Sequence, residues 1–260
     1  MWNIMKAQNY QIKGDNLIIF GLLFSLVLPV AGPLLDGAGF DYMTGSMYAV
    51  NMFAFFPYIF MILSLIIVTR IMGWDMNDKT MNYELLSGHS RAQVFFGRVI
   101  MSLAWTIIAS VIVAAIPTAL FTVINGWGHS LKIGDFAVRF AAFLFPCIRW
   151  ICEVGFITIL VKNSNVGMVI GFLMLEGSVI VSEVFKELLD VKLDALFACP
   201  NLLALAEISN SRQQLIGDEM ITVYDGTVNM PLLNSTIIVS LAAGAVFTLI
   251  GYMIFRKNDM

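Results

Sequence analysis

Residues 94–123 read VFFGRVIMSLAWTIIASVIVAAIPTALFTV and contain a single charged side chain, Arg98. About twenty predominantly apolar residues are enough for an α-helix to cross the hydrocarbon core of a bilayer. This stretch is longer than that, so it predicts a membrane-spanning helix that tilts or extends beyond the hydrocarbon. Pro117 lies inside the stretch and is expected to kink the helix.

Further apolar stretches of the same character lie on both sides of this one, and Pro146 is a second expected kink. Together they predict an all-α polytopic membrane protein with six transmembrane helices, at 17–35, 47–72, 94–123, 136–161, 166–184 and 235–255. The composition agrees, because 59% of the residues are hydrophobic and 13% are charged. A soluble domain carries about 25% charged residues. We therefore expect one transmembrane domain over residues 1–260.

The lysines and arginines of the short connections predict the orientation. They gather in four connections that lie on one side of the membrane if there are six spans: Lys6, Lys13, Arg70, Lys79, Arg91, Arg98, Lys162, Arg256 and Lys257. The loop at 36–46 contains no lysine or arginine, and the loop at 124–135 contains only Lys132. Both termini are therefore expected in the cytoplasm, with a cytoplasmic interfacial segment at 1–16 and an extracytoplasmic segment at 185–234.

The cytoplasmic connection at 73–93 carries clear helix signals. Asp78 suits a helix N-cap and Gly88 suits the left-handed residue that closes a helix. Ser90 and Gln93 have the spacing of a capping box at the start of the third span. These signals predict a short amphipathic helix on the membrane face, a sharp turn, and a second helix that runs into the membrane. The residues alone leave two roles open, an interfacial linker with solvated charges or a docking helix that transmits a force.

The run KTMNYELLSGHSR at 79–91, followed by Gly97-Arg98 and an apolar span, resembles the permease subunits of the ATP-binding-cassette type-2 exporter family. Many members have proline where this chain has His89. The similarity in layout extends over nearly the whole chain, with a cytoplasmic segment before the first span and a large outer segment before the last.

The resemblance implies a location in the bacterial cytoplasmic membrane and a coupling helix that sits in a cleft of a separate ABC ATPase subunit. The implied contact residues are Thr80, Tyr83, Glu84, Leu85, Leu86, His89 and Arg91. The first segment would form an elbow helix on the same subunit, and the outer segment would form short re-entrant helices. The sequence permits these helices, because residues 184–197 are amphipathic, Cys199-Pro-Asn is expected to break the helix, and residues 202–208 are apolar again.

We expect a transport subunit rather than an enzyme. The chain has no GxxxxGK[ST], HExxH or GxSxG motif, so ATP and Mg would bind in the partner ATPase and this chain would hold no cofactor. A second permease chain, identical or related, would complete the transporter. The cysteines and histidines show no metal-ligand spacing and the basic residues form no nucleic-acid-binding patch. The expected cargo is amphiphilic, such as a peptide antibiotic, a drug or a lipid-like molecule, which fits a role in antibiotic resistance or immunity.

Arg149 and Glu153 in the fourth predicted span, and Glu176 in the fifth, are charges at similar expected depths in the membrane. Such residues normally pair or line a polar cavity. Three roles stay open for this cluster: a structural ion-pair lock, a polar patch that contacts substrate, or a proton relay. The alternative functions are accordingly a proton-coupled secondary transporter, or an intramembrane enzyme that uses Glu153 and Glu176 as acid and base.

Overall fold

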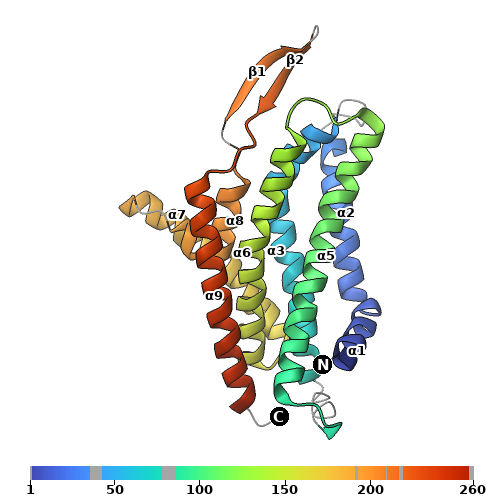
Figure 1. Ribbon diagram of the computed structural model, residues 1–260, viewed down its shortest axis with the longest axis vertical. Helices are drawn as coiled ribbons and strands as arrows, with labels where there is room; N and C mark the ends of the chain where they lie inside the picture. Colours follow the sequence, from blue (N-terminus) through green and yellow to red (C-terminus); the bar gives the residue numbers. More distant parts are fainter. Residues whose placement is uncertain are drawn as a thin grey trace.

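The computed structural model describes residues 2–35, 43–77, 86–190, 193–208, 210–216 and 219–257. Most of its helices run along one long axis, and a β-hairpin projects from one end (Figure 1). The helices are α1 (Trp2–Lys13), α2 (Asn16–Leu35), α3 (Gly45–Asn77), α5 (Arg91–Asn125), α6 (Ile133–Val161), α7 (Ser164–Leu189), the 3-10 helix η2 (Asp194–Leu196), α8 (Ala198–Ala206) and α9 (Met230–Lys257). The hairpin pairs β1 (Ser211–Ile216) with β2 (Glu219–Tyr224), and Gln213 lies opposite Thr222.

Among the described residues, five helices are long and apolar enough to cross a membrane: α3, α5, α6, α7 and α9. A sixth candidate is α1 together with residues 16–31 of α2, which form a pair bent by 64°. The prediction of a polytopic helical membrane protein is therefore confirmed. The fourth predicted span, at 136–161, lies within helix α6 (Ile133–Val161).

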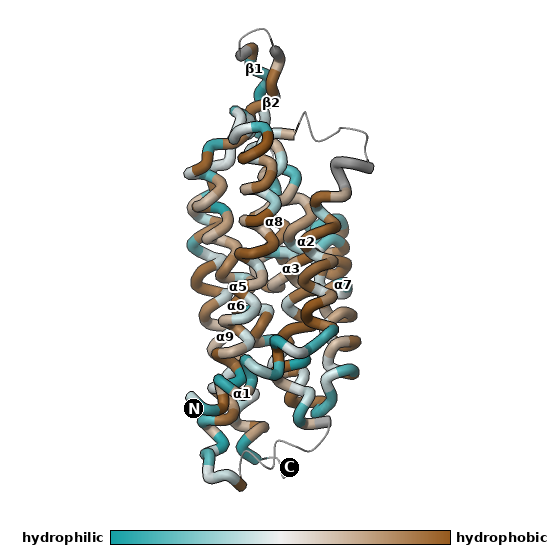
Figure 2. The backbone as a smooth tube through the Cα atoms, turned by 90° about the vertical axis from the view of Figure 1, so that its right-hand side faces the viewer, coloured by the Kyte–Doolittle hydropathy of each residue, from teal (hydrophilic) through white to brown (hydrophobic). Residues whose placement is uncertain are grey.

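Helix α1, the start of α5 and the end of α9 lie together at the end of the molecule opposite the hairpin (Figure 1). We call this the terminal end, and the other the hairpin end. Figure 2 shows hydrophobic residues along the bundle and more hydrophilic residues at the terminal end. The bend between α1 and α2 follows from an N-cap, because the Asp15 carboxylate accepts from the backbone N–H groups of Leu17 and Ile18 at 2.9 and 3.4 Å.

Helix α3 forms the centre of the bundle. In its apolar stretch 72% of the residues are buried, compared with 17% in α7 and in α9. It packs against α5, α6 and α7, and the rings of Phe53 and Phe143 meet edge to face at 5.3 Å. Near the terminal end, a Cβ on Gly73 would lie 2.6 Å from Cγ2 of Thr158 in α6. Close packing of this kind holds helices together in lipid, where water exclusion contributes little.

The segment between α7 and α9 departs from the prediction in three ways. Helix α7 continues to Leu189 instead of ending at 184, and it ends where Asp190 adopts a left-handed φ of 52°. The expected helix break at Cys199-Pro is wrong, because these residues lie in the first turn of α8. Proline fits there, because it lacks a backbone N–H and the N–H groups of the first turn have no acceptor within the helix. The hairpin was not predicted at all.

Candidate functional site

The connection between α3 and α5 is described from Leu86 onward, and its sequence-based cap is present. The Ser90 hydroxyl accepts from the backbone N–H of Gln93 at 3.2 Å, and the Gln93 side chain accepts from the backbone N–H of Ser90 at 3.1 Å. Gly88 has a positive φ of 89°, as expected for the turn before this cap. These two hydrogen bonds therefore fix the residue at which helix α5 begins.

The residues predicted to contact an ATPase fall partly outside the described residues. Thr80, Tyr83, Glu84 and Leu85, with the predicted N-cap Asp78, belong to the part of the connection that is not described. Of the others, Leu86 is 81% exposed and His89 is half-buried. Arg91 donates from Nη1 to the carbonyl oxygen of Arg256 at 2.8 Å, which ties the start of α5 to the end of α9.

A polar network joins α1 to both flanks of this connection. Arg98 of α5 is 1% exposed, and its Nη2 and Nη1 donate to the Asp75 carboxylate at 2.6 Å and to the Ile71 carbonyl at 3.0 Å. Gln8 and Gln11 of α1 donate to the same carboxylate at 3.3 and 3.4 Å. The end of α3, the first turns of α5 and the middle of α1 therefore meet at Asp75.

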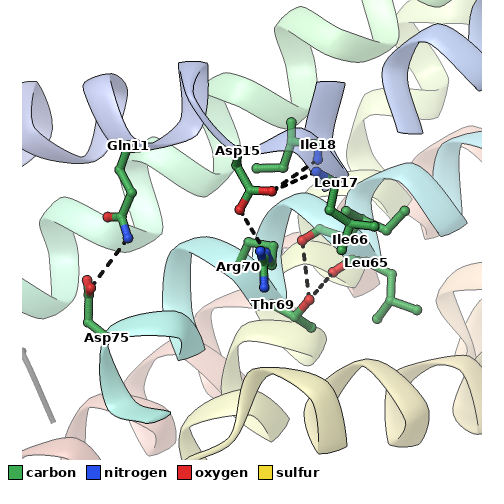
Figure 3. A network of polar contacts seen from close by, with 9 residues as sticks. All are labelled: Gln11, Asp15, Leu17, Ile18, Leu65, Ile66, Thr69, Arg70 and Asp75. Carbon is green, nitrogen blue, oxygen red and sulfur yellow. Dashed lines mark hydrogen bonds and ion pairs between the residues drawn. The ribbon is translucent and has the colours of Figure 1, made fainter. Parts of the chain in front are cut away.

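A second link in the network joins Arg70, about one helical turn before Asp75 in α3, to Asp15 at the start of α2 (Figure 3). Arg70 of α3 donates from Nε to the Asp15 carboxylate at 2.7 Å, and its guanidinium carbon lies 3.4 Å from the ring centroid of Trp74. On the other side of α1, the Trp105 indole N–H donates to the Asn9 side chain at 3.2 Å. Helix α1 is thus fastened to α3 and α5 through several side chains.

No pairing of these residues was predicted from the sequence. Arg70 and Arg98 were considered only as positive charges that set the orientation, and Asp15 and Asp75 were not predicted to take part in a site. A usable signal was present, because acidic and basic residues flank successive spans at comparable depth. The sequence could not show which acid faces which base, since that depends on how each helix is rotated about its axis.

The intramembrane charges form a pair rather than the expected cluster of three. Arg149 donates from Nε to the Glu153 carboxylate at 2.7 Å, and each residue is 6% exposed. The i, i+4 spacing placed both on one helix face, as the sequence indicated. Glu176 is exposed on α7, and no ion pair joins it to Arg149 in the part of the chain that the structure describes.

The other donors of Arg149 hold the segment after α7. Nη1 donates to the Ala195 carbonyl at 3.1 Å and Nη2 donates to the Leu196 carbonyl. Both carbonyls belong to η2, so the buried guanidinium fastens this short helix to α6. These are the contacts that the first of the three open roles, a structural ion-pair lock, requires.

A second buried arginine, which the sequence analysis did not single out, organises the hairpin end. Arg139 of α6 is 4% exposed and donates to four backbone carbonyls, those of Leu205, Glu207, Gly226 and Thr227. These carbonyls lie at the end of α8 and just after β2. Its position within the predicted fourth span was the available signal, since a charge there needs partners.

The remaining candidate groups are dispersed. His89 lies at the terminal end and His129 is exposed in the loop between α5 and α6. Cys147 and Cys199 are buried free thiols, and Cys152 is a half-buried one. Among the described residues there is no group of three or more His, Cys, Asp or Glu side chains that could hold a metal ion.

Comparison with protein-family models gives no match to the chain, and comparison with curated protein sequences gives none either. The assignment of a function therefore rests on the sequence and on the geometry described above.

Proposed function

We propose that the chain is the membrane-spanning permease subunit of an ATP-driven ABC exporter in a bacterial cytoplasmic membrane. A separate subunit binds and hydrolyses ATP with Mg, and the connection between α3 and α5 is the element that it pushes. The cargo is an amphiphilic molecule, such as a peptide antibiotic, a drug or a lipid-like compound, which suits a pathway formed largely by apolar helices.

The observation that carries this proposal is the polar network around Asp75. It joins the last turns of α3 to α5 and to α1 through Arg98, Gln8 and Gln11. A connection that only links two spans needs no such attachment. A segment that is pushed by another protein needs firm attachments at both ends, because without them the segment would bend and the attached helices would not move. The capping box at Ser90 adds a stiff start to α5.

A second permease chain is the partner that we propose for the exposed surface of α7. This helix is only 17% buried along its apolar stretch, and Glu176 is exposed on it. A carboxylate that faces lipid is unfavourable by a few kcal/mol near the bilayer centre. Contact with a second chain, or with a polar path between two chains, would remove Glu176 from lipid.

The two alternative functions use Glu153 and Glu176 together, as proton carriers or as acid and base. The geometry argues against both, because Glu153 is buried and bonded to Arg149 on its own helix, whereas Glu176 is exposed on α7. A proton-coupled transporter also differs from the proposal in its energy source.

The test is transport by this chain in sealed membrane vesicles prepared from cells that express it with its ATPase. The proposal predicts that cargo efflux stops when ATP is depleted and persists when the pH gradient is collapsed. Efflux that survives ATP depletion and is driven by an imposed pH gradient would replace the proposal with the secondary transporter.

A further inference from the structure

An open groove lies at the bend between α1 and α2, at the terminal end of the molecule. Its volume is about 600 Å³, and polar and apolar side chains line it together: Gln11, Asp15, Arg70, Leu17, Phe20 and Trp74. The groove shares Gln11 with the network around Asp75, but the proposed coupling role assigns it no ligand. A lining of mixed character at the start of a membrane-spanning helix is suited to a ligand that is itself polar at one end and apolar at the other.

The polar part of the groove is organised around the guanidinium of Arg70. Its Nε is occupied by the Asp15 carboxylate at 2.7 Å, and its plane is fixed against Trp74, with 3.4 Å between the guanidinium carbon and the ring centroid. Within the described part of the chain its two Nη groups have no hydrogen-bond acceptor. The side chain is 14% exposed, so these donors remain open to a ligand. A held guanidinium with two free NH2 groups matches the oxygens of a phosphate.

The Asp15 carboxylate already accepts three hydrogen bonds from groups of the chain. One oxygen accepts from the backbone N–H groups of Leu17 and Ile18, and the other accepts from Arg70. Its negative charge does weaken the attraction of Arg70 for an anion. Removal of the Asp15 charge should therefore raise the affinity of the groove for an anion, whereas removal of the guanidinium should lower it.

The apolar part of the groove lies on the first turns of α2. Leu17 is 38% exposed and Phe20 is 66% exposed, and they follow Asp15 directly along the chain. The guanidinium therefore lies beside the first residues of an apolar helix, which is where a lipid headgroup meets a membrane span. Tryptophan also prefers this interfacial level, as Trp74 illustrates. A free phosphate ion would use only the guanidinium, whereas a lipid would use both parts.

We propose that this groove binds a glycerophospholipid from the leaflet at the terminal end. Arg70 donates to the phosphodiester, and Leu17 and Phe20 contact the first part of an acyl chain. The bound lipid fixes the angle between the interfacial helix α1 and the span that follows it. This proposal requires a protein embedded in a bilayer and is independent of the ATP-driven function.

The experiment measures lipid retention by the full chain in detergent. Delipidated protein is incubated with phosphatidylglycerol, and bound lipid is counted by native mass spectrometry. Arg70→Gln removes the positive charge and the paired donors of the guanidinium. Asp15→Asn keeps an acceptor for the N-cap and removes the negative charge. Lys13→Gln is the matched control, because Lys13 is an exposed cation of α1 that does not line the groove. Inorganic phosphate and glycerophosphoglycerol, which lack acyl chains, are tested as competitors.

We expect retention to fall roughly tenfold in Arg70→Gln, to rise in Asp15→Asn and to be unchanged in Lys13→Gln, with no competition from the two soluble phosphates. Any other pattern overturns the proposal. Equal losses in the two groove variants would mean that the ion pair only supports the fold. Equal losses in Arg70→Gln and Lys13→Gln would mean nonspecific attraction, and competition by inorganic phosphate would mean an anion site. If Arg70→Gln does not fold, the Asp15→Asn result decides alone, and retention that is not raised refutes lipid binding.

Discussion

Replacement of Arg149 by alanine should destabilise the protein through two separate losses. The substitution leaves the Glu153 carboxylate, 6% exposed, without its partner, and it leaves the carbonyls of Ala195 and Leu196 without their donors. Removing one partner of a buried ion pair costs about 3–5 kcal/mol, and each buried acceptor left without a donor costs about 1–3 kcal/mol. Hydrogen bonds between membrane helices are weaker than these values suggest, so we expect a total loss of about 3 kcal/mol.

The assay is thermal unfolding of the purified protein in detergent, together with the yield of monodisperse protein. Two further variants make the interpretation specific. In Arg149→Ala with Glu153→Ala the stranded carboxylate is absent, so part of the lost stability should return. Glu176→Ala should have no effect on stability, because that side chain is exposed and unpaired with Arg149 in the described chain.

An unchanged melting temperature and yield for Arg149→Ala would refute the argument that this pair fastens η2 to α6. A loss in Glu176→Ala as large as that in Arg149→Ala would instead support the cluster of three charges that the sequence predicted. The comparison therefore separates the observed pair from the predicted cluster.

Three further substitutions test the packing and capping. Arg139→Ala should cost about 3 kcal/mol and expose the segment around β1 and β2 to added protease, because four backbone carbonyls lose their donor; an unchanged digestion rate would contradict this. Ser90→Ala should cost about 1 kcal/mol in thermal unfolding through loss of the α5 N-cap, and a stability equal to wild type would argue against the capping box. Gly73→Ala should destabilise by about 1–3 kcal/mol, because its Cβ would meet Thr158 at 2.6 Å, whereas Gly177→Ala has open space and serves as the control; equal effects of the two would refute the close approach.

The membrane helices could be predicted from the sequence because their signal is local. An apolar run long enough to cross a bilayer has few alternatives, and backbone polar groups in lipid must be satisfied within the helix. The capping box was local as well, since Ser90 and Gln93 form it between themselves. Helix α7 extends beyond the predicted span limit at 184, because residues 185–189 continue the helix as an amphipathic turn.

The missed features depend on contacts between distant parts of the chain. Strand β1 contains Arg212-Gln-Gln and shows no alternation of apolar and polar residues, so only its pairing with β2 reveals it. Glu153 was a correct partner for Arg149 because their spacing places them on one face. The inclusion of Glu176 in the predicted cluster was wrong, because equal depth in two neighbouring helices does not show toward which side each side chain points.

The central claim, that this chain is the permease partner of a separate ATPase, is tested most directly by its purification from native membranes. Wild-type protein and Leu86→Glu are compared, with Leu215→Glu as control. Leu86 and Leu215 are 81% and 64% exposed, and Leu215 lies in the hairpin, far along the chain from the connection before α5. Wild type and Leu215→Glu should retain an ATPase with a phosphate-binding loop whose hydrolysis rate depends on this chain, and Leu86→Glu should lose it. The claim is contradicted if wild-type protein retains no such ATPase, or if its hydrolysis rate is the same without this chain.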